Sequence, residues 1–207
     1  MNTKEKIIHE ALRLFSKKGY DAVSVRDIAG AVGIKESSLY YHFRNKQELF
    51  DTIVEFCFQQ AKSYFQEHAL PFDEQDDLTM FRETDPEKLT ELIFHTFGYF
   101  FDDPCNVMFR RLLLLGQYEN ERIREIYKGL YREYPLKIQR EIFAMLMERG
   151  LFRKEHPESA AIEFYGVIYM LIHTCDSLEE AKPIIREHMQ QFIKNYLVLS
   201  TPQNNLT

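Results

Sequence analysis

The sequence predicts an all-α protein of about nine helices, and two observations support this class. Apolar residues recur at helical spacing along nearly the whole chain, and no long stretch alternates with the two-residue period of a strand. Capping residues, glycines and prolines stand where these apolar stripes begin and end. Hydrophobic residues make up 45% of the 207 residues, which is enough for a packed core.

Three short helices are expected within residues 1–46. The first carries an apolar stripe formed by Ile8, Ala11, Leu12 and Phe15. Asn2 with Glu5 can cap its start, and Gly19 ends it. Ser24 with Asp27 opens a second helix that ends before Gly33, where glycine most easily adopts a positive φ. The third helix continues to residue 43.

Six longer helices are expected in the rest of the chain. Asn45 with Glu48 caps the first, which runs from residue 46 to about 67. Residues 69–84 are acidic and aperiodic and predict a loop, after which Pro86 starts a helix. The others span 104–117, 119–149, 157–175 and 178–198. Pro135 is expected to kink or split the helix at 119–149, Ser177 caps the last, and the tail at 201–207 frays.

Charge divides the chain at the same place as the pattern of helices. Residues 1–46 hold nine basic and five acidic residues, a net charge of +4, while the remainder holds 17 and 27, a net charge of −10. A basic N-terminal domain (1–46) on an acidic body (47–207) is the layout expected when only the first part meets phosphate. The alternative is a chance distribution of solvated surface charge.

Several classes of protein are not supported by the sequence. The longest apolar runs, 112–115 and 167–172, are too short to span a bilayer, and the charged N-terminus does not resemble a signal peptide. Cys57, Cys105 and Cys175 lie far apart, which favours buried, unreactive thiols in a reducing compartment. We therefore expect a cytoplasmic protein without a membrane partner.

The sequence supports neither of two other functions, an enzyme or a helical adaptor. An enzyme would need reactive motifs, yet the chain has no Glu-x-x-His pair, phosphate-binding glycine loop, nucleophile elbow or Cys/His metal cluster. We therefore expect no catalytic activity, no cofactor and no metal. A helical adaptor that binds RNA or membrane through its basic part would need an aromatic β-platform or a more uniformly basic helix.

The segment at residues 24–46 carries the main functional signal. Two short helices joined by a glycine turn are what a helix-turn-helix needs, and Ala29 lets them cross closely. Six apolar residues are spaced to bury one shared face: Val25, Ile28, Val32, Ile34, Leu39 and Phe43. The residues left outside combine phosphate-binding types with short side chains that can approach base edges. The alternative is a plain helical hairpin with a polar outer face.

Three local motifs lie within residues 11–49. The first helix carries Ala-Leu-Arg-Leu-Phe at 11–15 with Gly-Tyr at 19–20. The second helix carries Ser24, Ile-Ala at 28–29 and Gly-Ile at 33–34, and the third segment carries Leu-Tyr at 39–40, Phe43, Lys46 and Leu49. In these motifs the chain resembles the tetracycline-repressor (TetR/AcrR) family of bacterial regulators. The resemblance implies a ligand-responsive regulator, usually a repressor, that binds duplex operator DNA.

The resemblance also implies roles for individual residues. Tyr40 and Lys46 match positions that contact operator phosphates, and Lys46 lies at a helix N-terminus that attracts the same anion. Further backbone-contact positions are matched by Ser38 and His42. Positions facing base edges are matched by Glu36, Ser37 and Tyr41. Arg26, Ser24 and Lys35 complete the DNA-binding set.

Lys35 and Glu36 lie where the recognition helix is expected to begin. A carboxylate at Glu36 can accept a hydrogen bond from cytosine, although it can equally serve as a partner of the helix dipole. Many family members carry Ser or Thr where this chain has Lys35, which cannot cap a helix. The start of the helix, and with it the base-facing register, could therefore shift by one residue.

The C-terminal body is rich in aromatic residues, most of which are expected to be core. Some can line a pocket for a small apolar or aromatic effector, with tyrosines and histidines as polar handles. The ligand-binding candidates are His95, Phe97, Tyr127, Tyr131, Phe164, Tyr165, Tyr169 and His173. Effector binding would move the middle helices and change the distance between the DNA-binding heads (residues 1–46) of two paired chains.

The resemblance implies a homodimer that pairs through its last two helices. Two apolar stripes there are the candidates, and Gly166 would permit close approach. The dimer-interface residues are Ala161, Ile168, Ile172, Ile185, Met189, Phe192 and Tyr196. Two recognition helices about 34 Å apart read a palindrome. The alternative is that both stripes face the core of their own chain.

Overall fold

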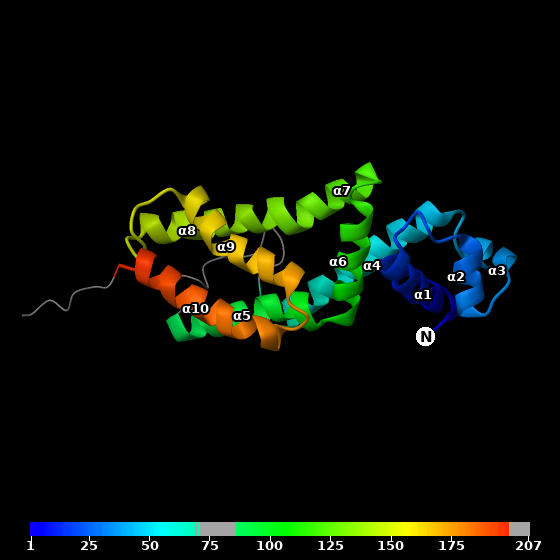
Figure 1. Ribbon diagram of the computed structural model, residues 1–207, viewed down its shortest axis with the longest axis horizontal. Coiled ribbons are helices and arrows are strands. Elements are labelled where there is room, and N and C mark those ends of the chain that lie inside the picture. The colour runs from blue at the N-terminus through cyan, green and yellow to red at the C-terminus, as the bar shows by residue number, and fades with distance from the viewer. Residues whose placement is uncertain (69, 71–85, 199–207) are drawn as a thin grey trace, which may run out of the picture. The chain divides into compact units, whose positions relative to one another are not determined.

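The computed structural model describes residues 1–68, 70 and 86–198, and it confirms an all-α fold (Figure 1). Extended pairing within these residues is limited to one isolated bridge between Phe152 and Leu197. The chain forms two compact units. Unit 1 comprises Met1–Phe72 with Thr96–Leu130, and unit 2 comprises Asp73–His95 with Tyr131–Thr207. The functional division predicted at residue 46 follows a different criterion and stays a prediction.

Unit 1 contains the first four helices, α6, α7 and the last residues of α5. The helices are α1 (Thr3–Lys18), α2 (Val25–Val32), α3 (Glu36–His42), α4 (Lys46–Glu67), α5 (Pro86–Asp102), α6 (Pro104–Gly116) and α7 (Glu121–Lys128). Helix α1 packs against α2, α4 and α6. Fully buried side chains from three of these helices, including Phe15, Phe50 and Leu112, form the core. Burial of this apolar surface supplies the main stabilising free energy of the unit.

The predicted helix ends in unit 1 are confirmed. Asn2 accepts a hydrogen bond from the Glu5 backbone, and Ser24 accepts one from that of Asp27. Both carboxylates return a bond to the capping backbone, as a capping box requires. Gly33 has φ +78° in the turn after α2, where a side chain would strain the backbone. The local sequence therefore sets the boundaries of these helices.

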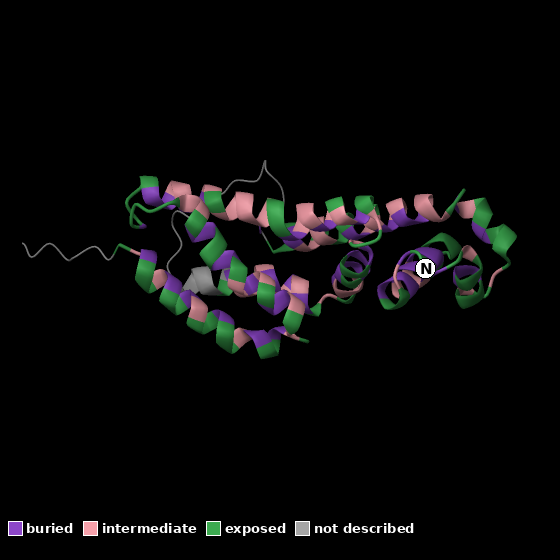
Figure 2. Cartoon of the chain, turned by 45° about the horizontal axis from the view of Figure 1, so that its top comes forward, coloured by how far each residue is buried: buried purple, intermediate pink, exposed green. Residues whose placement is uncertain are grey.

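Unit 2 contains the other end of α5 and the last helices. These are η2 (Gly129–Glu133), which begins in unit 1, α8 (Tyr134–Glu148), α9 (Pro157–Thr174) and α10 (Leu178–Tyr196). Helix α9 packs against both α8 and α10. An aromatic cluster fills the core, and its ring centroids lie 5.2 Å apart for Phe143–Phe192 and for Phe164–Phe192. All three rings are buried, and Figure 2 shows in purple how buried residues are distributed along the helices.

The helix around Pro135 is split as predicted. Helix α7 ends at Lys128, five residues follow as a π-helix, and α8 resumes with Pro135 in its first turn. Proline has no backbone N–H and its ring excludes the carbonyl four residues earlier, so the ordinary α pattern cannot continue through it. With α7, η2 and α8 taken as one continuous helix, the described residues hold nine.

Two expectations fall on residues that the structure does not describe. The predicted loop at 69–84 lies outside the described residues except for Leu70, which is buried. The predicted fraying at 201–207 also lies outside them. The remaining predicted helices agree with the observed bounds within about three residues.

Candidate nucleic-acid interface

Helices α2 and α3 form the predicted helix-turn-helix. Ile28, Leu39 and Phe43 are buried between them and the rest of unit 1, and Ala29 is buried at the crossing. The turn is closed by the backbone N–H of Ile34, which donates to the Ala29 carbonyl at 3.0 Å. Val25, Val32 and Ile34 are only half-buried. This arrangement leaves the rest of the α3 surface in solvent.

Helix α3 presents a polar and aromatic face. Of its seven residues only Leu39 is buried, while the side chain of Tyr41 is 87% exposed and that of Tyr40 48%. The other sequence-predicted contacts on and beside this face are exposed: Ser24, Arg26, Lys35, Glu36, Ser37 and Ser38. His42 is half-buried, and its ring lies edge-on to Tyr41. A helix with two exposed tyrosines and short hydroxyl side chains has the chemistry to meet phosphates and base edges.

The start of α3 does not shift. Lys35 occupies the N-cap position with extended backbone and makes no side-chain capping bond, and the helix begins at Glu36. The prediction that Lys35 cannot cap is therefore confirmed, while the base-facing register of the helix stays a prediction. Glu36 lies in the first turn, where a carboxylate is stabilised by the helix dipole.

Lys46 has structural partners that the sequence did not reveal. Its Nζ donates to the backbone carbonyl of Tyr20 at 3.0 Å and to that of Val23 at 3.1 Å. It also lies 4.3 Å from the centroid of the Tyr20 ring. The ammonium therefore ties the start of α4 to the connection between α1 and α2. An ammonium has three donors, so one remains for another acceptor such as a phosphate.

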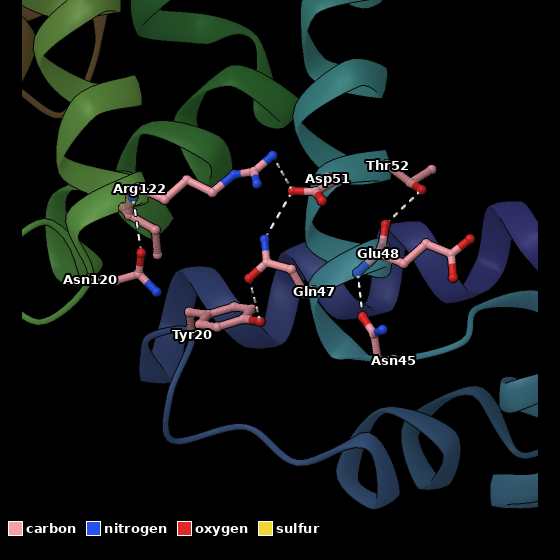
Figure 3. A network of polar contacts seen from close by, with 9 residues as sticks. Tyr20, Asn45, Gln47, Glu48, Asp51, Thr52, Asn120 and Arg122 are labelled. Atoms are coloured by element: carbon pink, nitrogen blue, oxygen red, sulfur yellow. Dashed lines mark hydrogen bonds and ion pairs between the residues drawn. The ribbon is translucent and has the colours of Figure 1, made fainter.

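A chain of polar contacts continues from Tyr20 to α7 (Figure 3). The Tyr20 hydroxyl lies 3.4 Å from Gln47 Oε1, and Gln47 Nε2 donates to Asp51 Oδ1 at 2.9 Å. Arg122 of α7 reaches the same carboxylate at 2.8 Å. Of these residues, only Tyr20 belongs to a sequence motif, the Gly-Tyr pair at 19–20. The four-residue spacing of Gln47 and Asp51 on α4 was a local signal, whereas nothing in the sequence pointed to Arg122.

The environment of Tyr20 favours its neutral form. Its ring packs against Phe15 and Phe50, with centroids 5.2 Å away in both cases. Burial raises the pKa of the phenol, and the carboxylates of Asp21 and Asp51 raise it further, while Arg122 opposes them. The hydroxyl thus stays protonated and available as a hydrogen-bond donor at neutral pH.

The ligand candidates divide between the two units. Phe97 and Tyr127 are buried in unit 1, and His95 is exposed in unit 2. In unit 2, four candidates form one cluster: Tyr131, Tyr165, Tyr169 and His173. The Tyr165 hydroxyl donates to the Tyr131 carbonyl at 3.0 Å, and the rings of Tyr169 and His173 lie 4.3 Å apart. Phe164 instead belongs to the aromatic core around Phe192.

The dimer candidates face the interior of their own unit. All seven are buried within the single chain: Ala161, Ile168, Ile172, Ile185, Met189, Phe192 and Tyr196. This burial supports the alternative that both stripes pack on the chain's own core. A different face of α9 carries exposed Ile162 and Met170, with Gly166 between them. A Cβ added to Gly166 would meet no atom within 4 Å, so this face is open.

Two further properties bear on function. None of the helices in the described part of the chain combines the length and apolar character that a membrane span requires. Over the same residues, the structure brings together no group of three His, Cys, Asp or Glu side chains able to hold a metal ion.

Comparison with known proteins identifies the N-terminal helices. Residues 7–53, which run from α1 into α4, match the profile of "Bacterial regulatory proteins, tetR family". A 55-residue segment is 53% identical to the biofilm operon icaADBC negative transcriptional regulator IcaR of Staphylococcus epidermidis. Residues 7–53 are therefore similar to the N-terminal region of tetR-family regulators. The IcaR match covers 27% of this chain and 30% of the relative, so it concerns the N-terminal part alone.

Solved structures extend the tetR-family likeness to the whole fold. The regulator PfmR from Thermus thermophilus has a TM-score of 0.61 at 23% identity, over 91% of this chain and 97% of that one. The flavonoid-responsive regulator FrrA has a TM-score of 0.59 at 18% identity, over 96% and 98%. At these identities the likeness concerns the fold. The match to a profile of regulatory proteins agrees with the expectation that the chain is not an enzyme.

Proposed function

We propose that the chain is a transcriptional repressor that binds duplex operator DNA as a homodimer and is released by a small apolar or aromatic molecule. Helix α3 would lie in the major groove, with Ser37, Tyr41 and Glu36 toward base edges. Tyr40, Ser38 and Lys46 would contact phosphates. The protein would act in the cytoplasm, where its DNA lies.

The exposed face of α3 carries this proposal. The side chain of Tyr41 is 87% exposed, although burial of a large aromatic ring is favourable. Such exposure is expected of a residue that becomes buried when the protein binds another molecule. The same helix lies within the segment that is 53% identical to a negative regulator. The net positive charge of residues 1–46 further favours a polyanionic partner.

The open face of α9 supports pairing with a second copy. Ile162 is 54% exposed and Met170 49%, and Gly166 between them would let a second helix approach closely. Ile184 of α10 is also exposed. A Gly166→Glu variant should sediment as a monomer, whereas Glu187→Gln, a change at an exposed position of α10, should not alter the mass. Equal masses for both variants would place the interface elsewhere.

The cluster of Tyr131, Tyr165, Tyr169 and His173 is the proposed wall of the effector site. It combines aromatic surface with hydroxyl and imidazole groups, as sites for small aromatic molecules commonly do. One structural neighbour is named as flavonoid-responsive, which makes flavonoids the first probes. A flavonoid that binds should raise the melting temperature of the protein and weaken its binding to duplex DNA. Binding without any loss of DNA affinity would contradict the proposed release.

Selection of random duplex DNA on the purified protein tests the main proposal. We expect enrichment of a palindrome, and affinity for it should fall with salt by a slope of about 0.9 per phosphate contacted. A sequence-independent binder would show the salt dependence without enrichment. No binding to any duplex, by protein refolded free of small molecules, would contradict the proposal.

Two tyrosine variants locate the interface. Tyr41→Ala should weaken binding to the selected duplex by about 1–3 kcal/mol, because a base-edge contact is lost. Tyr118 provides the matched control, since its side chain is 81% exposed and lies after α6, outside the helix-turn-helix. Tyr118→Ala should leave the affinity unchanged. Similar losses in both variants would show that α3 is not the interface.

A further inference from the structure

Two cysteines separated by 48 residues in the sequence meet inside unit 1. Cys57 lies on α4 and Cys105 is the second residue of α6, and their sulfur atoms are 3.5 Å apart. Cys57 is 3% exposed, whereas Cys105 is half-buried and therefore within reach of a small solute. The expectation of buried thiols thus holds for Cys57 alone.

The two thiols have unequal acidity. When the Cys57 thiol donates to the Cys105 sulfur, it stabilises the Cys105 thiolate, which lowers the pKa of Cys105. The same bond and burial raise the pKa of Cys57. Cys175, the third cysteine, has a pKa raised by desolvation and by Glu180. Cys105 is therefore the cysteine best suited to attack an oxidant.

We propose that Cys57 and Cys105 form a redox switch, which a hydroperoxide oxidises to a disulfide that ties α4 to α6 and weakens binding to duplex DNA. The sulfur atoms are already in contact, and one of them is accessible. The effect on DNA rests on the proposed function, whereas the formation of the disulfide does not.

The reaction balances with the hydroperoxide as the only oxidant. The Cys105 thiolate attacks one peroxide oxygen, the O–O bond breaks, and the leaving oxygen takes a proton to become water or an alcohol. The resulting sulfenic acid is attacked by the Cys57 sulfur, which loses its proton as the S–S bond forms and water departs. The two thiols lose two electrons and two protons, and the peroxide accepts both.

The disulfide would move the helix that carries the DNA-binding head. An S–S bond is about 2.05 Å long, so the sulfur atoms must approach by about 1.5 Å. Cys57 lies eleven residues, or about three turns, after Lys46, which holds the connection between α1 and α2. A displacement of α4 at Cys57 therefore reaches the helix-turn-helix through one stiff helix. In a dimer, the two recognition helices would then no longer be spaced to match successive major grooves of the duplex, and contacts in both half-sites would be lost.

Mass spectrometry of the full chain tests the disulfide. After hydrogen peroxide treatment and alkylation, we expect a product two hydrogens lighter that carries one alkyl group, on Cys175, and a peptide joining Cys57 to Cys105. In the Cys57→Ser variant, dimedone should label Cys105 about tenfold faster than Cys175. Absence of the joined peptide, or links formed mainly through Cys175, would overturn the proposal.

Binding to the selected duplex tests the switch, with Cys175→Ser as the parent protein. Peroxide should raise the dissociation constant at least about tenfold, and dithiothreitol should restore it. Cys105→Ser in the same parent should make affinity insensitive to peroxide. If the protein with the Cys57–Cys105 disulfide binds the duplex as tightly as the reduced protein, the proposed switch is wrong. If the reduced protein binds no duplex sequence in preference to others, the repressor function and its redox regulation are both refuted. The mass measurement would still show whether the disulfide between Cys57 and Cys105 forms.

Discussion

The helices of the N-terminal head (α1 to α4) and the last helices of unit 2 mostly begin in different ways. Helices α1, α2 and α4 each start at a side-chain cap, such as Asn45, which accepts a hydrogen bond from the Glu48 backbone at 2.8 Å, while α3 lacks one. Helices α8 and α9 follow Glu133 and His156, which make no capping bond, although Ser177 caps α10. Local hydrogen bonds therefore define most helix starts in the head, whereas α8 and α9 depend more on the aromatic core that they share with α10.

Removal of a core ring from the C-terminal unit should give the largest loss of stability. Tyr131 is among the largest fully buried side chains, and Tyr131→Ala should lower the free energy of unfolding by about 3–5 kcal/mol. Tyr41→Ala in the head should change it by less than about 0.5 kcal/mol, because that side chain is exposed. Urea denaturation followed by circular dichroism measures both. Comparable losses would contradict the distinction between the two regions.

Loss of one hydroxyl from the same core should have a smaller effect. Tyr165→Phe leaves the buried Tyr131 carbonyl without the bond that it accepts at 3.0 Å, which should cost about 1–3 kcal/mol. Tyr118→Phe removes a solvent-exposed hydroxyl and serves as the control. If the two variants unfold at the same urea concentration, the hydrogen bond contributes nothing to the stability of unit 2.

Changes at the two kinds of helix start should sharpen the comparison directly. Asn45→Ala removes the cap of α4 and should cost about 1 kcal/mol, while Asn45→Asp should retain most of the stability. His156→Ala removes no cap and should cost less than about 0.5 kcal/mol. The same denaturation assay applies. A larger loss from His156→Ala would mean that the start of α9 depends on its side chain after all.

A last effect should appear only at alkaline pH. The Tyr196 hydroxyl donates to Glu163 Oε2 at 2.7 Å, and burial together with this bond raises the pKa of Tyr196 from 10.0 to about 12. Since the folded state favours the neutral phenol, its contribution is complete below pH 10.0 and is lost as the pH rises through about 12. Tyr196→Phe should therefore lose less stability than the parent protein over that interval, as measured by urea denaturation. Parallel pH profiles for the two proteins would contradict the shift.

Much of the head could be predicted from sequence because its signals are local. The caps at Asn2, Ser24 and Asn45 act on residues three positions away, and Gly33 determines its own backbone conformation. The periodicity of α3 correctly separated Leu39 from the exposed residues around it. Pro135 likewise predicted the break in its helix, since the missing N–H is a property of one residue.

Features that depend on long-range packing could not be predicted. An apolar stripe shows that a helix buries one face but does not identify the neighbour that covers it, so the stripes of α9 and α10 were compatible with a dimer interface or with the chain's own core. The contact of Cys57 with Cys105 and that of Asp51 with Arg122 join residues 48 and 71 positions apart. The carbonyl partners of Lys46 come from a connection more than 20 residues earlier, so no local pattern revealed them.

The π-helix at Gly129–Glu133 lies in the run of helix between α7 and α8. An α-helix advances about 100° per residue, and a π turn accommodates roughly one residue more than an α turn. Such a segment therefore absorbs one extra residue within almost the same rotation, and deletion of one residue here should restore regular α geometry with little change in the direction of the α8 side chains. The chain could thus be shortened by one residue at this point without changing which face of α8 packs on α9.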